Sequence, residues 1–363
     1  MKRRDVLIGG GTLAAAAVGA TVIVVEQMGS AADYDTAIAA TRAPLPEQAA
    51  TRDLVRYATL APNGHNTQPW LFRASEGRIE ILPDLARRTT VVDPDDHHLF
   101  VSLGCAAENL ALAAAARGRP GTLRFDPQAD GLIAFDFSPG PAVASALFQA
   151  IPQRQSTRAD YDGRSVSAVD LRSLAAAAAM PGVDLVLITD RPQIDRVRDL
   201  VASGNSMQMA DPAFMRELKS WLRFNPRQAA ETRDGLYSAA SGNPTLPTWA
   251  GPRAFDTFAT AKSENDKYAR QLRTSSGVAV FTGVKEDRDH WVRVGRACQR
   301  FALQATALGL KHAFVNQPVE VPTLRPELAA LVGMPGRRPD IVMRFGHGAN
   351  LPFSARRPAR FIV

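Results

Sequence analysis

The segment Ala61-Pro62-Asn63-Gly64-His65-Asn66-Thr67-Gln68-Pro69-Trp70 decides how the fold of this chain is interpreted. Its Pro-Asn-Gly sequence predicts a turn, because proline and glycine interrupt regular structure and asparagine tolerates left-handed backbone angles. The side-chain amides that follow carry both donors and acceptors, so they suit a ring system that presents both. The alternative is an ordinary polar loop that leads into a strand, with Trp70 anchored in the core.

This segment resembles the flavin-contacting loop of the FMN-dependent nitroreductase superfamily, usually Ala-Pro-Ser-x-x-Asn-x-Gln-Pro-Trp, with Asn63 where serine is commoner. The resemblance implies an α+β fold with FMN at a two-fold interface. It implies the reduction of nitro compounds, quinones, enones or halogenated phenols. The cofactor-binding residues that it implies in this loop are Pro62, Asn63, Gly64, Asn66 and Gln68.

Composition places the chain among globular proteins. It has 363 residues, of which 45% are hydrophobic and 22% are charged, and this argues against wholesale disorder. The net charge is +7, but the arginines are scattered and form no basic block with interleaved aromatic residues, so no nucleic-acid partner is expected. Two cysteines make neither a disulfide framework nor a zinc site.

Residues 1–30 resemble a twin-arginine export signal or a membrane anchor. Arg3 and Arg4 precede an uncharged run, residues 6–25, that is rich in glycine and alanine and long enough to span a bilayer. No clean Ala-x-Ala cleavage site follows, so cleavage and retention both stay open. The sequence predicts export to the periplasm or to the outer face of the cytoplasmic membrane. Residues 31–46 are predicted to form a mobile linker.

Two predicted Ala-rich helices match at a constant offset of 191 residues (291 − 100 and 309 − 118). Phe100 to Gly118 and Trp291 to Gly309 each begin with an aromatic residue and end with a glycine that suits a helix C-cap. Long apolar faces are typical of central buried helices. Chance similarity of two Ala-rich helices is the alternative to an internal repeat.

Other segments extend the repeat. Residues 54–61 resemble residues 171–178, and residues 132–135 and 341–345 are both predicted strands. We therefore expect an α+β, nitroreductase-like fold that is duplicated in one chain, with halves at residues 47–145 and 146–363. Each half would pair an antiparallel sheet with helices, and a pseudo-two-fold axis would relate the two.

The second half opens with Arg154-Gln155-Ser156-Thr157-Arg158. Two arginines four residues apart can converge on one dianion, because guanidinium groups bind phosphate oxygens in a fork geometry and serine adds a donor. A solvated basic turn is the alternative. Arg-x-Ser-x-Arg resembles the FMN-phosphate motif of the nitroreductase superfamily. The cofactor-binding residues that this implies are Arg154, Gln155, Ser156 and Arg158.

The two halves carry different parts of such a site. The first half has the amide loop, and its stretch before residue 47 offers only Arg42 as a phosphate ligand. The second half has the arginine motif, but Ala179-Met180-Pro181-Gly182 stands where the loop would be. We therefore predict one composite flavin site in each chain.

Two later segments also resemble cofactor-contacting parts of the superfamily. Val315, Asn316 and Gln317 align with the segment that faces flavin N5, and an ordinary loop is the alternative. Arg356 and Arg357 follow the final strand, where a basic residue reaches the phosphate in the superfamily. Adjacent residues of an extended segment point in opposite directions, so one of the two is expected to do so.

Residues 203–258 form an insertion, which is predicted to be either a lid over the flavin or a remote packing layer. Its aromatic residues argue against disorder. His65 is a weak candidate for a proton donor, with a hydrogen-bonded loop histidine as the alternative. Asp93, Asp95 and Asp96 precede His97 and His98, and we interpret them as a charged helix entrance and not as a metal site.

The function that follows is electron transfer through flavin N5 to a nitroaromatic, a quinone or a related small-molecule acceptor. No Gly-x-Ser-x-Gly, His-Glu-x-x-His or P-loop sequence suggests other chemistry. The donor would be NAD(P)H or, for an exported protein, a membrane carrier. The alternatives are a non-catalytic protein that sequesters FMN under a lid and an exported domain that has lost its cofactor.

Overall fold

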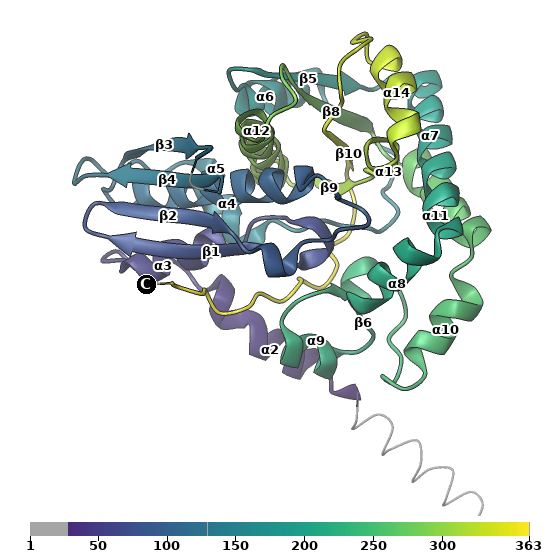
Figure 1. Cartoon of the computed structure of the whole chain (residues 1–363), viewed down its shortest axis with the longest axis horizontal. Helices are drawn as coiled ribbons and strands as arrows, with labels where there is room; N and C mark the ends of the chain where they lie inside the picture. The colour runs from purple at the N-terminus through teal and green to yellow at the C-terminus, as the bar shows by residue number, and fades with distance from the viewer. Residues whose placement is uncertain (1–27, 129, 363) are drawn as a thin grey trace, which may run out of the picture.

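The computed structural model describes residues 28–128 and 130–362, and the predicted signal or anchor lies almost wholly outside them. Two antiparallel four-stranded sheets form the framework (Figure 1). Sheet A has the order β1-β2-β4-β3 and sheet B has the order β5-β8-β10-β9. The strands are β1 (Trp70–Ser75), β2 (Arg78–Pro83), β3 (Gly121–Asp126), β4 (Leu132–Phe137), β5 (Val183–Ile188), β8 (Gly277–Gly283), β9 (Lys311–Phe314) and β10 (Ile341–Gly346). A short parallel pair, β6 (Leu222–Arg223) and β7 (Leu236–Tyr237), lies apart from them.

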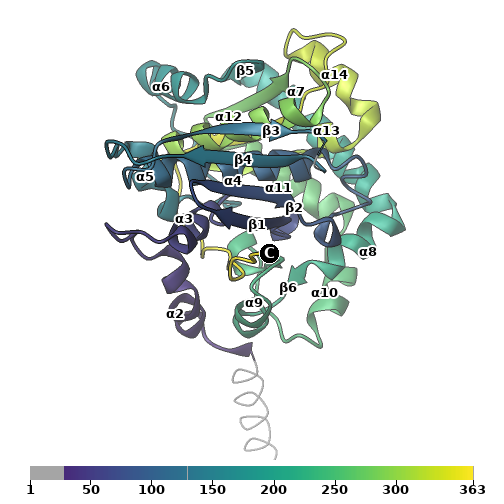
Figure 2. The same cartoon turned by 60° about the vertical axis from the view of Figure 1, so that its left-hand side comes forward.

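Helices fill the space between the sheets and cover the outer face of sheet B (Figures 1 and 2). They are α2 (Ala31–Arg42), α3 (Thr51–Ala58), α4 (His97–Ala115), α5 (Ala146–Ala150), α6 (Ala168–Ala178), α7 (Arg191–Ala210), α8 (Pro212–Ser220), α9 (Pro226–Thr232), α10 (Gly251–Phe258), α11 (Ala261–Arg273), α12 (Arg288–Ala307), α13 (Gln317–Glu320) and α14 (Arg325–Leu331). The helices that the sequence analysis paired at an offset of 191 residues are α4 and α12.

Helices α4 and α12 pack against each other at the centre of the molecule. A Cβ atom on Gly104 would lie 2.1 Å from the carbonyl oxygen of Val292, and one on Gly295 would lie 2.0 Å from that of Val101. Glycine therefore allows the two backbones to touch. The two contacts are reciprocal, since 295 − 104 and 292 − 101 are both 191. One apolar core surrounds this crossing and takes residues from both sheets.

The two sheets have the same strand order once β1, β2, β3 and β4 are matched with β5, β8, β9 and β10. Their burial differs. Strand β2 alternates between buried and half-buried residues, as a strand with one wet face does, whereas every residue of β8 and β10 is buried. A second apolar cluster, made by α7, α11 and α14, covers the outer face of sheet B.

The cover comes from the chain between β5 and β8. Sheet A joins β1 to β2 with the turn at residues 76–77, whereas sheet B joins β5 to β8 with residues 189–276. The insertion is thus longer than the predicted 203–258, because α7 and α11 at its two ends belong to the packing layer of sheet B. The part between them, from α8 to α10, reaches across to the first half (Figure 1).

Residues 31–42 form helix α2, and the prediction of a mobile linker there is wrong. Ser30 caps the helix by accepting a hydrogen bond from the Asp33 N–H at 3.0 Å. Tyr34 and Ile38 are buried against the insertion and the C-terminal tail. The local sequence does not predict this helix, because the residues that it packs against lie about 200 and 320 positions further along the chain.

One helix of the described residues, α4, is long and apolar enough to cross a membrane, but it is the buried core helix.

Candidate functional site

A cavity of about 670 Å³ lies between the two halves, beneath the insertion. Its floor comes from the loop at residues 62–65, the start of α4 and the residues around β9. Its cover is mostly apolar and comes from the insertion. The covering residues are Phe214, Leu218, Leu222, Phe224, Leu236, Leu246, Phe255 and Phe258. Only four of the 37 lining residues carry an Asp, Glu, Lys or Arg charge, so the space suits a mainly apolar ring.

The amide loop divides its residues between the cavity and the chain. Pro62, Asn63, Gly64 and His65 line the cavity. His65, Asn66 and Gln68 have φ angles of 46°, 54° and 55°. These left-handed conformations turn the loop sharply and cost energy for residues other than glycine, so the surrounding contacts must hold them in place.

Asn66 and Gln68 do not line the cavity, and their amides are bonded to the chain. The Asn66 Oδ1 accepts from Arg356 at 2.8 Å, and its Nδ2 donates to the Ala355 carbonyl at 3.2 Å. Gln68 donates to the Arg233 carbonyl at 2.8 Å and accepts from the Arg357 N–H at 2.8 Å. The two amides that were predicted to bind the ring thus connect the loop to the tail and to the insertion.

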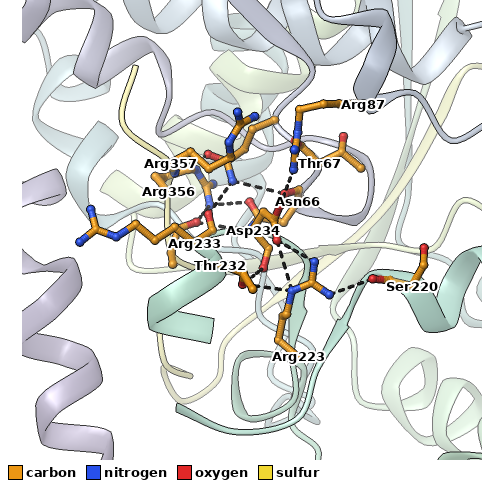
Figure 3. A network of polar contacts seen from close by, with 12 residues as sticks. Asn66, Thr67, Arg87, Ser220, Arg223, Thr232, Arg233, Asp234, Arg356 and Arg357 are labelled. Atoms are coloured by element: carbon orange, nitrogen blue, oxygen red, sulfur yellow. Dashed lines mark hydrogen bonds and ion pairs between the residues drawn. The ribbon is translucent and has the colours of Figure 1, made fainter. Parts of the chain in front are cut away.

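Further contacts fix the insertion to the first half (Figure 3). Asp234 of the insertion forms an ion pair with Arg87 of the first half, and it is held within the insertion by a second ion pair with Arg223 at 2.7 Å. The Glu217 carboxylate accepts from two backbone N–H groups of the first half, at residues 91 and 92, at 2.9 and 3.0 Å. The cover of the cavity is therefore fixed to the first half at residues 87, 91 and 92.

Residues 154–158 run in extended form beside β9. The Thr157 N–H donates to the His312 carbonyl at 2.8 Å, and Ser156 bridges to His312. Alternate side chains of an extended segment share a face, so Arg154, Ser156 and Arg158 lie on one side, about 13 Å from end to end. Gln155 lies on the other side, where its amide oxygen accepts from the Leu351 N–H at 2.9 Å.

Arg158 lies at the cavity end of this segment. Its side chain lines the cavity, and its backbone is held by Gln271, which donates to the Arg158 carbonyl at 2.6 Å. The buried Arg344 donates to the carbonyls on either side, at Thr157 and Ala159, at 3.1 and 2.7 Å. Arg154 lies at the far end, so the two arginines do not converge on one point.

Arg154 and Arg356 are buried and form a cluster with the half-buried Arg42. Arg154 and Arg356 both donate to the Leu60 carbonyl, at 2.9 and 3.4 Å, and Arg42 donates to the Arg154 carbonyl at 3.4 Å. Burial lowers the pKa of Arg154 to about 10 and that of Arg356 to about 9. Within the part of the chain that the structure describes, none of the three forms an ion pair with a carboxylate.

Arg357 points away from this cluster. Its pKa is lowered by partial burial and by Arg87, on the side where Asp84 and Asp234 lie. Of the two adjacent arginines, only Arg356 therefore lies beside Arg154.

Several buried polar atoms around the cavity have no hydrogen-bond partner. Of eleven such atoms in the described residues, six belong to His65, Arg154, His312 and Gln317. Buried polar groups in folded proteins are normally paired, so a region where unpaired ones gather is a candidate ligand-binding site. The Nε and Nη1 of Arg154 are the clearest case, because they are charged donors.

The pKa of His65 does not suit the role of proton donor near neutral pH that the sequence analysis considered. Burial, together with the nearby Arg158, lowers the pKa of His65 to about 4. Its imidazole is neutral at pH 7, so it offers the cavity a hydrogen bond but no proton tuned to neutral pH. His312 is similar, since burial and the nearby Arg154 lower its pKa to about 3.

The segment at residues 315–317 is divided as well. Asn316 and Gln317 line the cavity, whereas Val315 is buried behind them. The Asn316 Oδ1 accepts a hydrogen bond from the Val342 N–H at 2.9 Å. A hydrogen bond with the Gln317 side chain lowers the pKa of Tyr268, whereas burial raises it.

A second cleft, of about 990 Å³, lies between the halves beside α12. Asp289, Val292, Arg293 and Arg296 line it, and their counterparts 191 residues earlier line the cavity. These counterparts are His98, Val101, Ser102 and Cys105. The two clefts are therefore lined by matched positions of α4 and α12.

Comparison with known proteins gives relatives along nearly the whole chain. The chain is 28% identical over 337 residues to "Putative NAD(P)H nitroreductase Rv3131" of Mycobacterium tuberculosis, which covers 90% of this chain and 94% of the relative. It is 23% identical over 331 residues to "Putative NAD(P)H nitroreductase acg" of the same organism, with 86% and 96% covered. With "Probable NAD(P)H nitroreductase PigM" of Serratia it shares 26% over 200 residues, 52% of this chain and 55% of the relative.

No family model matches the chain. Among solved structures, the FMN-bound nitroreductase of Bacteroides fragilis superposes with a TM-score of 0.36 at 15% identity, covering 57% of this chain and 90% of the other. The nitroreductase NfnB of Mycobacterium smegmatis gives a TM-score of 0.37 at 12% identity, covering 56% and 87%. The structural likeness is weak.

The sequence analysis misplaced one residue of this region and assigned no role to two others. Arg42 was noticed, but it was placed in a linker. His312 stands four residues before Asn316 and carries no pattern of its own. Arg344 was assigned only to a strand, although a charged residue between Met343 and Phe345 in a buried strand is a signal of a specific role.

Proposed function

We propose that this chain is an FMN-binding, nitroreductase-like oxidoreductase with one composite cofactor site, and that an NAD(P)H- or carrier-derived hydride passes through flavin N5 to a small acceptor. The observation that carries the proposal is the pairing of an apolar cavity with uncompensated arginines at one end of an extended segment. The whole-length relatives named as NAD(P)H nitroreductases support it.

The residues fit an FMN molecule. A phosphate dianion would compensate Arg154 and Arg356 and would accept from the unpaired Nε and Nη1 of Arg154. A flat ring would lie against residues 62–65, with the unpaired Nδ1 of His65 and Oε1 of Gln317 at its edges. Arg158 would supply positive charge to the ring end of the site.

The chain's own residues would bind, orient and shield the cofactor, which supplies the hydride chemistry. The cover from the insertion would exclude water, and its ties at Asp234 and Glu217 would keep it in place. The apolar and aromatic cover favours an aromatic acceptor, such as a quinone or a nitroaromatic compound, over a charged one.

We further propose that the two halves arose by duplication and are related by a pseudo-two-fold axis. The equal strand order of the sheets and the reciprocal contacts of Gly104 and Gly295 support this relation. One half would supply the ring-binding loop and the other the phosphate-binding arginines, as the sequence analysis predicts.

A second candidate function is sequestration of FMN without turnover. The observation that favours it is that Gln68 and Arg87 of the first half hold the cover through residues 233 and 234, which would hinder a second substrate from reaching the ring. Reduction separates the two functions. If NAD(P)H bleaches the flavin and a quinone or nitroaromatic compound restores its colour, the protein is an enzyme. Bleaching by dithionite alone would favour sequestration or a different donor.

The location is a further part of the proposal. Arg3, Arg4 and the uncharged run at residues 6–25 support export by the twin-arginine route, with or without retention in the membrane. Replacing both arginines by lysine (R3K/R4K) and following the protein in cell fractions tests the proposal. Unchanged export of the variant would contradict it.

Arg154→Ala combined with Arg158→Ala tests cofactor binding. We expect a colourless protein, because the variant loses charged ligands at both ends of the segment. Arg52→Ala combined with Arg172→Ala is the control, since both arginines are exposed. Release of FMN on denaturation measures the load, and urea unfolding shows that the variants fold. A flavin load equal to that of the control would refute the assignment.

A further inference from the structure

The last residue of α2 reaches the arginine cluster at Arg154 and Arg356 from outside both sheet-bearing halves. The Arg42 Nη1 donates to the Pro152 carbonyl at 2.7 Å and to the Arg154 carbonyl at 3.4 Å. Its guanidinium lies 3.8 Å from the ring centroid of Phe353, three residues before Arg356. Arg42 thus touches the chain on both sides of the place where the phosphate would bind.

Helix α2 is also tied down at its other end. The Tyr34 hydroxyl donates to the Phe353 carbonyl at 2.7 Å, and Tyr34 is 1% exposed. Tyr34 and Ile38 pack with Tyr237 of the insertion, at 4.6 Å between the two tyrosine ring centroids. The helix therefore bridges the C-terminal tail, the insertion and the start of the second half.

Three guanidinium groups at this place repel one another unless an anion joins them. Arg356 and Arg154 each lower the pKa of Arg42, beyond the effect of burial. An isolated buried charge is costly, and a cluster of three without a carboxylate among the described residues is costlier still. A phosphate monoester with a charge near −2 would offset most of this repulsion.

We propose that α2 is a strap that closes the phosphate end of the site, and that Arg42 is the third arginine ligand of a bound phosphate monoester. The proposal rests on the proposed FMN site and adds a ligand to it. The cofactor would be held by three separate parts of the chain, and its release would require α2 to move away.

Binding of FMN and of riboflavin to the full-length protein tests this proposal, because riboflavin lacks the phosphate. We expect Arg42→Ala to weaken FMN binding by about 10- to 100-fold, the range for loss of a hydrogen bond between charged groups, and to change riboflavin binding by less than about two-fold. Arg42→Lys should restore part of the affinity. Arg52→Ala, on the neighbouring α3, should change neither.

Tyr34→Phe tests the strap without changing charge. It removes the hydroxyl bond to Phe353 and should speed FMN release, followed by the fluorescence of free flavin, while riboflavin release stays as in the wild type. Equal FMN affinity in wild type and Arg42→Ala would overturn the role of Arg42. Equal weakening of FMN and riboflavin would overturn the phosphate contact. If the wild type binds neither flavin, the proposed function itself fails.

Discussion

The two clefts between the halves are lined by matched positions of α4 and α12, yet their chemistry differs. In the cleft beside α12, eight of sixteen lining residues carry charges, four acidic and four arginine. They neutralise one another, as in the pair of Arg293 with Asp289 at 2.6 Å. In the cavity beside α4, four of 37 lining residues are charged, and the arginine cluster behind it has no acidic partner among the described residues.

The difference lies in the side chains at the matched positions and not in the room that they leave, because the cleft beside α12 is the larger one. Ser102 and Cys105 line the cavity beside α4, whereas Arg293 and Arg296 stand at the matched positions beside α12. Arg296 is further used to pair with the buried Glu108 at 2.9 Å. A cleft that satisfies its own charges has no need of a ligand, whereas unpaired buried charges favour one.

The crossing of α4 and α12 supports both clefts, and changes there should have the largest effect. We expect Gly104→Ala and Gly295→Ala each to lower the free energy of unfolding by about 3 kcal/mol, because a Cβ would lie about 2 Å from a carbonyl oxygen. Urea unfolding measures this. Strongly unequal losses would contradict the equivalence of the two sides. Gly64→Ala is the control for a glycine change, because Gly64 has open space for a Cβ and no positive φ.

Exchanging the matched residues sharpens the comparison. Ser102→Arg should fill the cavity and weaken FMN binding by about 10- to 100-fold, in line with the cost of overpacking. Arg293→Ser in the other cleft should leave the stoichiometry at one flavin for each chain, because no arginine cluster lies behind that cleft. Titration with FMN measures both. A second flavin bound to Arg293→Ser would show that the two sides are closer in chemistry than the structure indicates.

The two adjacent tail arginines form a natural pair of test and control. Arg356→Ala should weaken FMN binding by about 10-fold or more, because it removes a charged ligand beside Arg154. Arg357→Ala should change it by less than about two-fold, since that side chain faces Asp84 and Asp234. Equal losses in the two variants would show that the cluster is not the phosphate site.

A fall in pH should lower the free energy of unfolding of the cofactor-free protein, because two histidines near the cavity resist protonation in the folded state. These buried histidines have folded-state pKa values of about 4 (His65) and about 3 (His312), below the unfolded value near 6.5. A group whose pKa is lower in the folded state than in the unfolded state supports folding fully at pH values above its unfolded-state pKa. This support is lost as the pH falls below that value. We expect a loss of roughly 1 kcal/mol for each pH unit and each histidine below pH 6.5.

Asp340 acts in the opposite direction. Burial raises its pKa to about 6, so its contribution grows as the pH falls from 6 toward 3.8 and offsets one histidine in part. Thermal unfolding between pH 7 and pH 4.5 measures the sum, and His312→Asn should flatten the curve. If the variant shows the same slope as the wild type, His312 does not contribute to it.

Local pattern was enough to predict the parts of the fold that carry their own periodicity. The paired Ala-rich helices are α4 and α12, and the strands predicted at residues 132–135 and 341–345 are β4 and β10. In β2, buried and half-buried residues alternate, as expected for a sheet with one face in solvent. In β8 every residue is buried, as expected for a sheet that is covered on both faces.

The candidate site was predicted less well than the fold. The amide loop and Arg158 line one cavity, whereas Arg154 and Ser156 are not among its lining residues. Asn66 and Gln68 carry the right chemistry for a ring, yet their amides are already bonded to residues 233 and 355–357. A sequence shows which groups are able to form hydrogen bonds. It does not show which partners these groups have in the folded chain.

The sequence by itself determined the two matched helices, the alternation of the strands and the placing of the loop and the arginines in different halves, because each is a property of neighbouring residues. Only the tertiary structure decided that residues 31–42 are a helix, that Arg42 joins Arg154 and Arg356, and that the insertion covers one cleft and not the other. The physical reason is that burial, charge repulsion and the strain of left-handed residues depend on contacts between segments up to about 300 residues apart.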